Sequence, residues 1–518
     1  MKKYWLSTLL LLLILTAAAC GGPATEAPAD PTAVTAVLEV TNTEPPAPTE
    51  AVPPATEPPA TPTETAPVAT EVQPTEPVAG PTFNILSVVN RDITQAAFGP
   101  SLAVGATTPG APPTAWIAWV ENSAPGSRQI FVSEWNGEAL QPRGASLNLH
   151  LNVLADSPSI TFAGENAAVP WVVWVEPSPG FGDILNTFAS RFNVASGLWQ
   201  PAGQDRGDGE PSLNSQTNRP AGQSVIAGGS GDPTLPPAPW VVWSELGRLS
   251  NFTQLFVSKG IKDESGIGGF IWQLVGELRH NDEPTLNVDV FRHALRPSII
   301  FAETGNAVPW ITWHEEGADR PSRIFTARGV ADAKVPGGFK WVFTPACDPD
   351  EIACSLNLNP LKDAKDATMA AGSITPGEAT VPWITWAEVG PTGKWQVFVS
   401  RLDPVSRASF VNVGGSLNVD QNQDARHPII VFLKNVPYVS WEEDDGSGNF
   451  RVHLRHLASD PQTGTWVLDS PAEGFDHDAA LSNSGLTVAA GVDTLFLAWV
   501  EGDPATEVAQ VILAAFKP

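Results

Sequence analysis

The stretch Val169-Pro-Trp-Val-Val-Trp-Val-Glu176 contains the phrase on which the fold depends. An aromatic residue is followed by two mostly small or β-branched residues, then by Trp, one variable residue and Glu. The phrase occurs seven times, and its second tryptophans are 55 to 73 residues apart. A repeat of this period, rich in β-branched and aromatic residues, predicts a β-propeller with one blade per copy. The copies are Trp116/Trp119/Glu121, Trp171/Trp174/Glu176, Trp240/Trp243/Glu245, Trp310/Trp313/Glu315, Trp383/Trp386/Glu388, Tyr438/Trp441/Glu443 and Phe496/Trp499/Glu501.

Each repeat is longer than its tryptophan phrase and contains four short β patterns. In the fourth copy, Pro297–Phe301 reads as a first strand A, and the phrase entered through Pro309 reads as strand B. In the third copy, Gln254–Ser258 reads as strand C and Phe270–Val275 as strand D. Proline is tolerated at the first residue of a strand, where its missing N–H breaks no ladder bond. Four antiparallel strands make a propeller blade, so we expect an all-β fold with seven blades.

The two ends of the repeat array complement each other. The seventh copy has a strand A near Leu486–Val488, a strand B through Trp499 and a strand C at Gln510–Leu513, but no strand D. At the other end, residues 83–89 precede the first repeat and have no blade of their own. We therefore expect residues 83–89 to complete the last blade, which closes the ring and removes its open sheet edges.

Residues 1–19 have the pattern of a secretory signal. Lys2–Lys3 precede the apolar run Leu9–Leu15, and small residues lead to Cys20. The run is too short for a membrane-spanning helix. Ala17-Ala-Ala-Cys20 resembles the lipobox of bacterial lipoproteins, with Ala17 where that family prefers Leu. The resemblance implies lipidation of Cys20 and an extracytoplasmic lipoprotein anchored at the cell membrane or cell surface. An ordinary secretory signal is the alternative.

Residues 20–81 consist mainly of Pro, Thr, Ala and Glu and contain neither Lys nor Arg. Such a segment buries too little apolar surface to fold, so we expect a disordered linker between Cys20 and a propeller over residues 82–518. The chain carries a formal charge of −27. Roughly −20 of this falls on the propeller, which disfavours nucleic acid and anionic lipid as partners because both need a basic surface.

Two cysteines remain besides Cys20. Cys347 and Cys354 close a short loop, and in an extracytoplasmic protein such a pair predicts a disulfide. The segment between them supplies no further Cys or His for a metal site.

A second phrase, Ser/Thr-Leu-Asn, recurs between the repeats and predicts connectors of similar shape. Its Asn is expected to hydrogen-bond local backbone. In a propeller the D–A connectors and the B–C loops emerge on the same face, so they rim one mouth of the central channel. The phrase occurs at 146–148, 212–214, 285–287, 355–357 and 416–418.

The glutamates of the seven phrases have two interpretations. Strand alternation puts each Glu on the same side of strand B as the second Trp, so the seven could form an acidic ring facing a ligand or cation. Alternatively, each accepts hydrogen bonds from the backbone or a Ser of a neighbouring blade. The structural role is favoured, because function usually lies where a repeat is broken and all seven blades keep this Glu. The unusual cluster His314-Glu315-Glu316 ends one strand B. The candidate ligand-binding residues are Glu121, Glu176, Glu245, His314, Glu315, Glu388, Glu443 and Glu501.

The aromatic-rich blades of residues 83–518 resemble the sialidase-like propellers of bacteria. The Asp-box of that group, Ser-x-Asp-x-Gly-x-x-Trp, is absent. Its Tyr nucleophile has no counterpart either, because Tyr4 lies in the signal and Tyr438 in a core position. Neither Gly-x-Ser-x-Gly nor His-Glu-x-x-His occurs. We therefore expect no sialidase activity and assign no catalytic residue.

Two acidic segments are candidates for calcium. Asp420, Asn422 and Asp424 alternate as in half of an oxygen-ligand loop, and residues 444–449 form a second acidic turn. Neither has the frame of an EF-hand, so we expect no cofactor, with calcium as the alternative.

The expected function is non-catalytic binding of an extracellular glycan, peptide or protein by a monomer, on the face of the D–A and B–C loops. The alternative is a glycoside hydrolase or lyase acting on an extracellular polysaccharide, with paired carboxylates in the central channel.

Overall fold

The computed structural model describes residues 80–518 except 124–125, 165, 167, 180–183, 207–208, 249–250, 280–281, 319, 347–353, 459–463 and 503–508. The predicted signal, Cys20 and most of the linker therefore lie outside the described residues. The described part belongs to one compact unit, Pro77–Pro518. It contains strands, turns and two 3-10 turns, η4 (Thr304–Asn306) and η5 (Pro336–Gly338), and no helix within it is long and apolar enough to cross a membrane.

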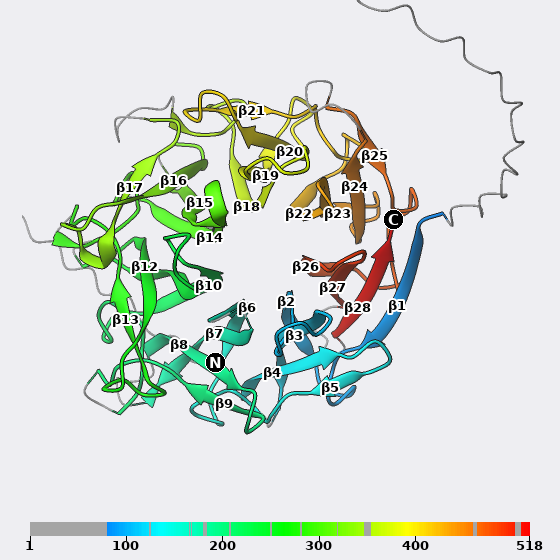
Figure 1. Cartoon of the computed structure of the whole chain (residues 1–518). Helices are drawn as coiled ribbons and strands as arrows, with labels where there is room; N and C mark the ends of the chain where they lie inside the picture. Colours follow the sequence, from blue (N-terminus) through cyan, green and yellow to red (C-terminus); the bar gives the residue numbers. More distant parts are fainter. Residues whose placement is uncertain are drawn as a thin grey trace, which may run out of the picture. The chain divides into compact units, whose positions relative to one another are not determined.

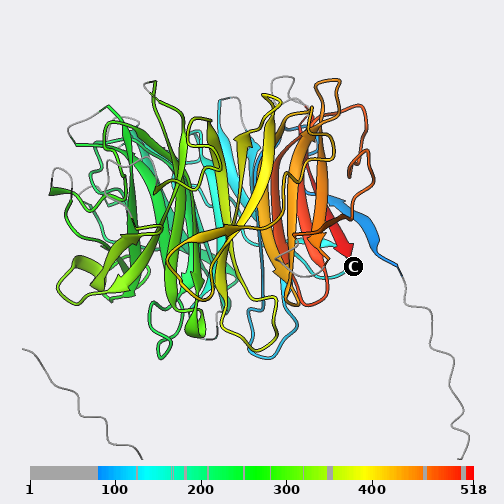
Figure 2. The ribbon, with the colours of Figure 1, turned by 90° about the horizontal axis from the view of Figure 1, so that it is seen from above.

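Seven four-stranded antiparallel sheets form a ring around a central channel, which confirms the predicted fold (Figure 1). Seen from above, the strands run between the two faces of the ring (Figure 2). We number the blades from 1 to 7 in chain order. Blade 1 comprises β2 (Ala97–Gly105), β3 (Thr114–Asn122), β4 (Arg128–Trp135) and β5 (Leu140–Pro142). Blade 2 comprises β6 (Asp156–Ala163), β7 (Val169–Ser178), β8 (Ile184–Asn193) and β9 (Leu198–Pro201). Blade 3 comprises β10 (Ala221–Gly229), β11 (Ala238–Leu246), β12 (Thr253–Lys262) and β13 (Phe270–Leu274).

The remaining blades repeat this order, with strand A at the channel and strand D outermost (Figure 1). Blade 4 comprises β14 (His293–Ala302), β15 (Val308–Glu316), β16 (Arg323–Ala331) and β17 (Phe339–Phe343). Blade 5 comprises β18 (Ala364–Gly372), β19 (Val381–Val389), β20 (Trp395–Leu402) and β21 (Phe410–Asn412). Blade 6 comprises β22 (Ala425–Leu433), β23 (Val436–Asp444), β24 (Phe450–Leu457) and β25 (Trp466–Leu468). Blade 7 comprises β26 (Asn483–Ala490), β27 (Leu495–Glu501) and β28 (Gln510–Lys517), and β1 (Thr82–Val88) pairs with β28 as its fourth strand.

The two aromatic residues of each phrase supply the core between blades. They are three residues apart on strand B, so they point to opposite faces of the sheet. The first aromatic residue of one blade therefore lies in the same hydrophobic cluster as the second Trp of the next blade. Trp116 and Trp174 share one such cluster, and Trp240 and Trp313 share another. Twelve tryptophans of the phrases are almost completely buried. Burying a side chain of this size is worth several kcal/mol, so each blade boundary is a substantial hydrophobic core.

Strand A has an irregularity that is the same in all seven blades. A β-bulge interrupts its pairing with strand B close to the end where strand A begins. Each bulge contains one residue with positive φ, between 43° and 64°. These seven positions form a ring around the channel near the mouth that the D–A connectors and B–C loops rim. The ring consists of Gly99, Ser157, Gln223, Arg296, Asp366, His427 and Gly485.

Candidate functional site

The glutamates of the seven phrases are buried, and they hold the D–A connectors in place. Glu315 accepts hydrogen bonds from the Val288 N–H (2.6 Å), the Asp289 N–H (3.0 Å) and the indole Nε1 of Trp313 (3.0 Å). The other six make the same three kinds of bond. None of the seven is more than 2% exposed. The carboxylates thus join strand B to the connector that precedes the blade, and their binding of an external ligand stays a prediction.

Burial disfavours the charge on these carboxylates. It raises the pKa of Glu176, Glu245 and Glu315 to about 7, against the hydrogen bonds that favour the charged form. The pKa values of Glu388 and Glu443 are raised for the same reason.

The connector Asn forms a second repeated support. Asn148 accepts a hydrogen bond from the Ile130 N–H of strand C and donates its amide to the Arg128 carbonyl. The same arrangement recurs at Asn214, Asn287, Asn357 and Asn418, and also at Asn90, whose segment lacks the Ser/Thr-Leu phrase. These bonds set the shape of the connectors, as the sequence predicts for Asn in turns.

The ring of positive-φ residues loses its sevenfold character on one side of the channel. Blades 7, 1 and 2 place small residues there: Gly485, Gly99 and Ser157. Blades 3 to 6 place Gln223, Arg296, Asp366 and His427, and we call these four residues the channel arc. A non-glycine residue with positive φ costs on the order of 1 kcal/mol, and two blades show that Gly suffices for this bulge. The large polar side chains are therefore not required by the fold.

The channel arc is a continuous chain of polar contacts. The Arg296 backbone N–H donates to Oε1 of Gln223 (2.7 Å), and the Arg296 Nε lies 3.7 Å from Oδ1 of Asp366. The other carboxylate oxygen of Asp366 lies 3.7 Å from Nε2 of His427. Each contact joins two blades, so a ligand that engages one member of the arc perturbs its neighbours.

Glu442 supports the end of the channel arc from behind. Its Oε2 lies 3.2 Å from Nδ1 of His427 and 2.7 Å from Nε of Arg426, and its Oε1 accepts the Leu486 N–H of blade 7 (3.1 Å). The carboxylate is fully buried. Although burial opposes its charge, His427 and Arg426 hold the pKa of Glu442 below its ordinary value.

Glu442 and His314 occupy equivalent places in their blades, between the second Trp and the Glu. The other blades have Val120, Val175, Ser244, Ala387 and Val500 at this place. His314 is buried, and among the described residues its Nδ1 has no hydrogen-bond partner. Burial lowers the pKa of His314 to about 4, against the nearby Asp366 carboxylate. Of the predicted ligand-binding residues, only His314 lies beside the channel arc.

We expect the variant His314→Val, which restores the residue of three other blades, to gain stability relative to the native chain as pH falls. The folded pKa of about 4 lies below the ordinary 6.5, so between these values only the unfolded chain takes up the proton. The native chain therefore loses stability through His314 on acidification, and the variant does not. Urea denaturation measures the free energy of unfolding of both proteins at pH 7 and pH 4.5. The advantage of the variant over the native chain is expected to be about 2–3 kcal/mol larger at pH 4.5 than at pH 7. A difference that stays constant with pH would contradict the prediction.

A pocket opens on the same face beside the channel arc. It has a volume of about 400 Å³ and lies where strands of blades 4 and 5 begin or end. The Nζ of Lys365 lies 4.4 Å from the Trp395 ring, and the Ser322 N–H donates to Asp363 (2.8 Å). Glu316 lies 3.9 Å from Nε2 of His314, which connects this pocket to the arc. The lining residues are His293, Glu316, Gly317, Ser322, Asp363, Lys365 and Trp395.

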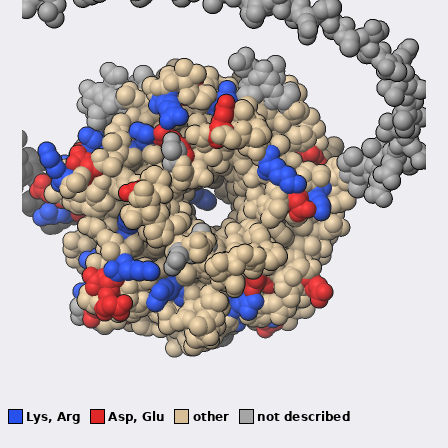
Figure 3. Space-filling view, in the orientation of Figure 1, with Lys and Arg blue, Asp and Glu red and all other residues tan. Residues whose placement is uncertain are grey.

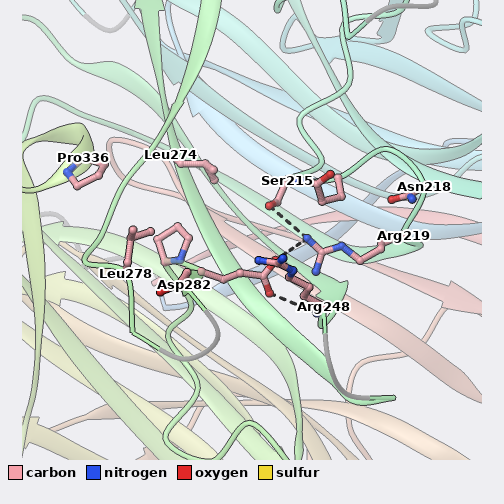
Figure 4. Close-up of a pocket in the computed structure, with 11 residues that line it drawn as sticks. Ser215, Asn218, Arg219, Arg248, Leu274, Leu278, Asp282 and Pro336 are labelled. Atoms are coloured by element: carbon pink, nitrogen blue, oxygen red, sulfur yellow. Dashed lines mark hydrogen bonds and ion pairs between the residues drawn. The ribbon is translucent and has the colours of Figure 1, made fainter.

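A larger cleft of about 760 Å³ lies between the connectors on either side of blade 3. Figure 4 shows an apolar side with Leu274, Leu278 and Pro336 and a polar side with Ser215 and Arg219. The Arg219 guanidinium donates to Glu283 (2.6 Å) and lies 3.4 Å from Glu245. The polar groups that line this cleft are thus largely bonded to one another.

The candidate calcium segments form their own hydrogen bonds. Asp420 accepts the Asn422 N–H, Asp424 pairs with Lys394, and Asp445 accepts the Ser447 N–H. In the described ranges, no group of three or more His, Cys, Asp or Glu is placed to hold a metal ion. The expectation of no cofactor, with calcium as the alternative, stays a prediction. Cys354 is buried, whereas Cys347 lies outside the described residues, so the disulfide also stays a prediction.

Comparison with known proteins finds only distant structural matches. No family model and no curated protein matches the chain. A crystal structure of a protein of unknown function from Dyadobacter fermentans has 11% identity and a TM-score of 0.43, over 85% of this chain and all of that one. An α-L-arabinanase from Penicillium chrysogenum, complexed with arabinobiose, has 12% identity and a TM-score of 0.41, over 70% and 93% of the two chains. A sialidase from Trypanosoma rangeli has 10% identity and a TM-score of 0.35, over 81% and 55%.

Proposed function

We propose that this protein is a non-catalytic propeller that binds an extracellular ligand at the channel mouth formed by the D–A connectors and B–C loops. One observation carries the proposal: four adjacent blades replace the small residue of the strand A bulge with Gln223, Arg296, Asp366 and His427. In blades 4 and 6 a second position changes as well, since His314 and Glu442 stand where the other blades have Val, Ser or Ala. Local strain that the fold does not require is typical of functional sites.

The shape of the molecule supports entry at this place. Figure 3 shows an opening at the centre of the ring, with atoms of Lys or Arg visible at its wall. A small-molecule or chain ligand typically binds in such a concave site, where a few polar groups set its orientation.

The state of the carboxylates favours binding over the hydrolase or lyase alternative. Asp366 is 8% exposed and lies between Arg296 and His427, and Glu442 is fully buried against Arg426 and His427. Acid–base glycosidase chemistry needs a pair of carboxyl groups that both reach the substrate. In this arc both carboxyl groups are engaged by the protein itself.

The test compares the full chain with a variant in which all four arc residues are glycine, by calorimetric titration with a panel of oligosaccharides and peptides of defined composition. We expect at least one probe to bind the native chain with a Kd on the order of micromolar and to lose at least about 2 kcal/mol of binding free energy in the variant. Gly suits the positive φ of the bulge. Because the variant also takes His427 away from the buried Glu442, its denaturation midpoint is measured first, and binding is compared at a temperature where both proteins are folded.

Ser157→Gly is the matched control, because it makes the same change in a blade outside the arc. It should bind every probe as the native chain does. If no probe separates the arc variant from this control, the proposed site is wrong. If the native chain cleaves a bound saccharide and the variant does not, as judged by mass spectrometry, the enzyme alternative is correct.

A further inference from the structure

We propose that the ligand of the channel arc is an acidic saccharide, and that Arg296 binds its carboxylate or sulfate group. This inference rests on the proposed function and specifies the chemistry of that site. It follows from which polar groups of the arc remain available to a ligand and from the pocket beside them.

The available groups of the arc are hydrogen-bond donors. The Arg296 side chain is 54% exposed, and among the described residues neither of its terminal nitrogens has a hydrogen bond. Gln223 uses its Oε1 for the Arg296 N–H, so its amide N–H groups remain for a ligand. His427, in contrast, turns Nδ1 to Glu442 and Nε2 to Asp366, so it is not counted among the available donors.

The carboxylates of the arc, in contrast, are hardly exposed. Asp366 is 8% exposed and lies 3.7 Å from both Arg296 and His427, and Glu442 is fully buried among Arg426, His427 and the blade 7 backbone. A cationic ligand would therefore find little carboxylate surface here, whereas an anion would find the exposed Arg296 guanidinium with the Gln223 amide beside it. Charge-assisted bonds from Arg to a carboxylate or sulfate are among the strongest and most directional in proteins.

The pocket beside the arc indicates that the anion is carried by a sugar. Lys365, which precedes Asp366 in the chain, lies over the Trp395 ring and lines this pocket together with Asp363 and Glu316. Lys365 covers one face of this ring, so a sugar would meet the rest of the indole, with the carboxylates beside it as acceptors for its hydroxyl groups. Because Lys365 lines the pocket and the next residue, Asp366, belongs to the arc, we expect neighbouring units of one oligosaccharide to reach both.

The experiment titrates the full chain with tetragalacturonate and with its methyl ester, which has the same sugar chain without the charges. We expect the acid to bind at least tenfold more tightly than the ester. Arg296→Gly should weaken binding of the acid by about tenfold to a hundredfold, which corresponds to the loss of charge-assisted hydrogen bonds. Arg296→Lys should retain part of the affinity, because it keeps the charge but not the fork. Ser157→Gly should bind as the native chain does.

Two further probes identify the source of the anionic group. Stronger binding of a sulfated galactan tetrasaccharide than of tetragalacturonate would support the inference with sulfate as the recognised group. Equal binding of tetraglutamate would overturn the saccharide part of it.

The inference is also overturned if neither acidic saccharide binds at about 1 mM, where a free energy of about −4 kcal/mol would be detected. Its failure is distinguishable from failure of the proposed function. If neutral saccharides bind as tightly as acidic ones and the four-glycine variant still loses them, the arc is the binding site but the anion is not what it recognises. If no probe responds to the arc substitutions, both proposals fail.

Discussion

Glu315→Ala is expected to lower the free energy of unfolding by about 3–5 kcal/mol, because two buried donors and one partly buried donor lose their acceptor and a cavity remains. The donors are the Val288 and Asp289 N–H groups and the indole of Trp313. Their loss releases the connector between blades 3 and 4 from strand B. Denaturant unfolding of the native chain and the variant measures the difference.

Glu316→Ala is the matched control, since it removes the same chemical group from the next residue, whose side chain is 50% exposed. Its effect should stay below about 0.5 kcal/mol, as is usual for a surface substitution. Equal effects of the two substitutions would contradict the structural role. A variant Glu315→Ala that unfolds like the native chain but loses a ligand would instead support the acidic ring.

The effect of Glu315→Ala should also depend on pH. Burial raises the folded pKa of Glu315 to about 7 from an ordinary 4.5. Such a group contributes stability that is fully present below pH 4.5 and is lost as pH rises through 7. The difference between native chain and variant is therefore expected to be larger at pH 5 than at pH 8.

The architecture could be predicted because one short phrase determines both sides of a blade. In Trp310-Ile-Thr-Trp313, alternation along a strand sends the two indoles to opposite faces, so every copy must lie between two others. The glutamate partners were harder to predict. The donors are the Trp on the same strand and the backbone of the connector, and only the folded connector brings Val288 N–H and Asp289 N–H to Glu315.

The channel arc was missed because strand A has no phrase that all seven copies share. A proline follows the bulge residue in blades 1, 2, 4 and 6 and is absent from the other three, and the bulge residues themselves share only a backbone conformation. The residue between the second Trp and the Glu of each phrase, however, could have been compared from the sequence alone. Aligning the seven copies at that place shows His314 and Glu442 among mostly apolar residues, which is the signal that marks the arc.

Glu442→Val, which restores the residue of three other blades, is expected to cost about 3–5 kcal/mol, because it leaves a charged partner without compensation. Arg426 and His427 lose their common carboxylate, and the Leu486 N–H loses its acceptor across the boundary between blades 6 and 7. Arg426 is only 33% exposed, so water replaces the lost ion pair incompletely.

The double variant Arg426→Leu/Glu442→Val should recover most of this loss, since Leu295 occupies the place of Arg426 in blade 4 and Val the place of Glu442 in blades 1, 2 and 7. Replacing a buried ion pair by apolar residues is often neutral, whereas breaking it is costly. The coupling energy between the two substitutions is therefore expected to exceed about 2 kcal/mol in a double-mutant cycle. Additive losses would mean that the pair is not coupled. If the double variant is as stable as the native chain but no longer binds a ligand of the arc, Glu442 serves to orient His427. The fold would then be stable without this carboxylate, and only binding would require it.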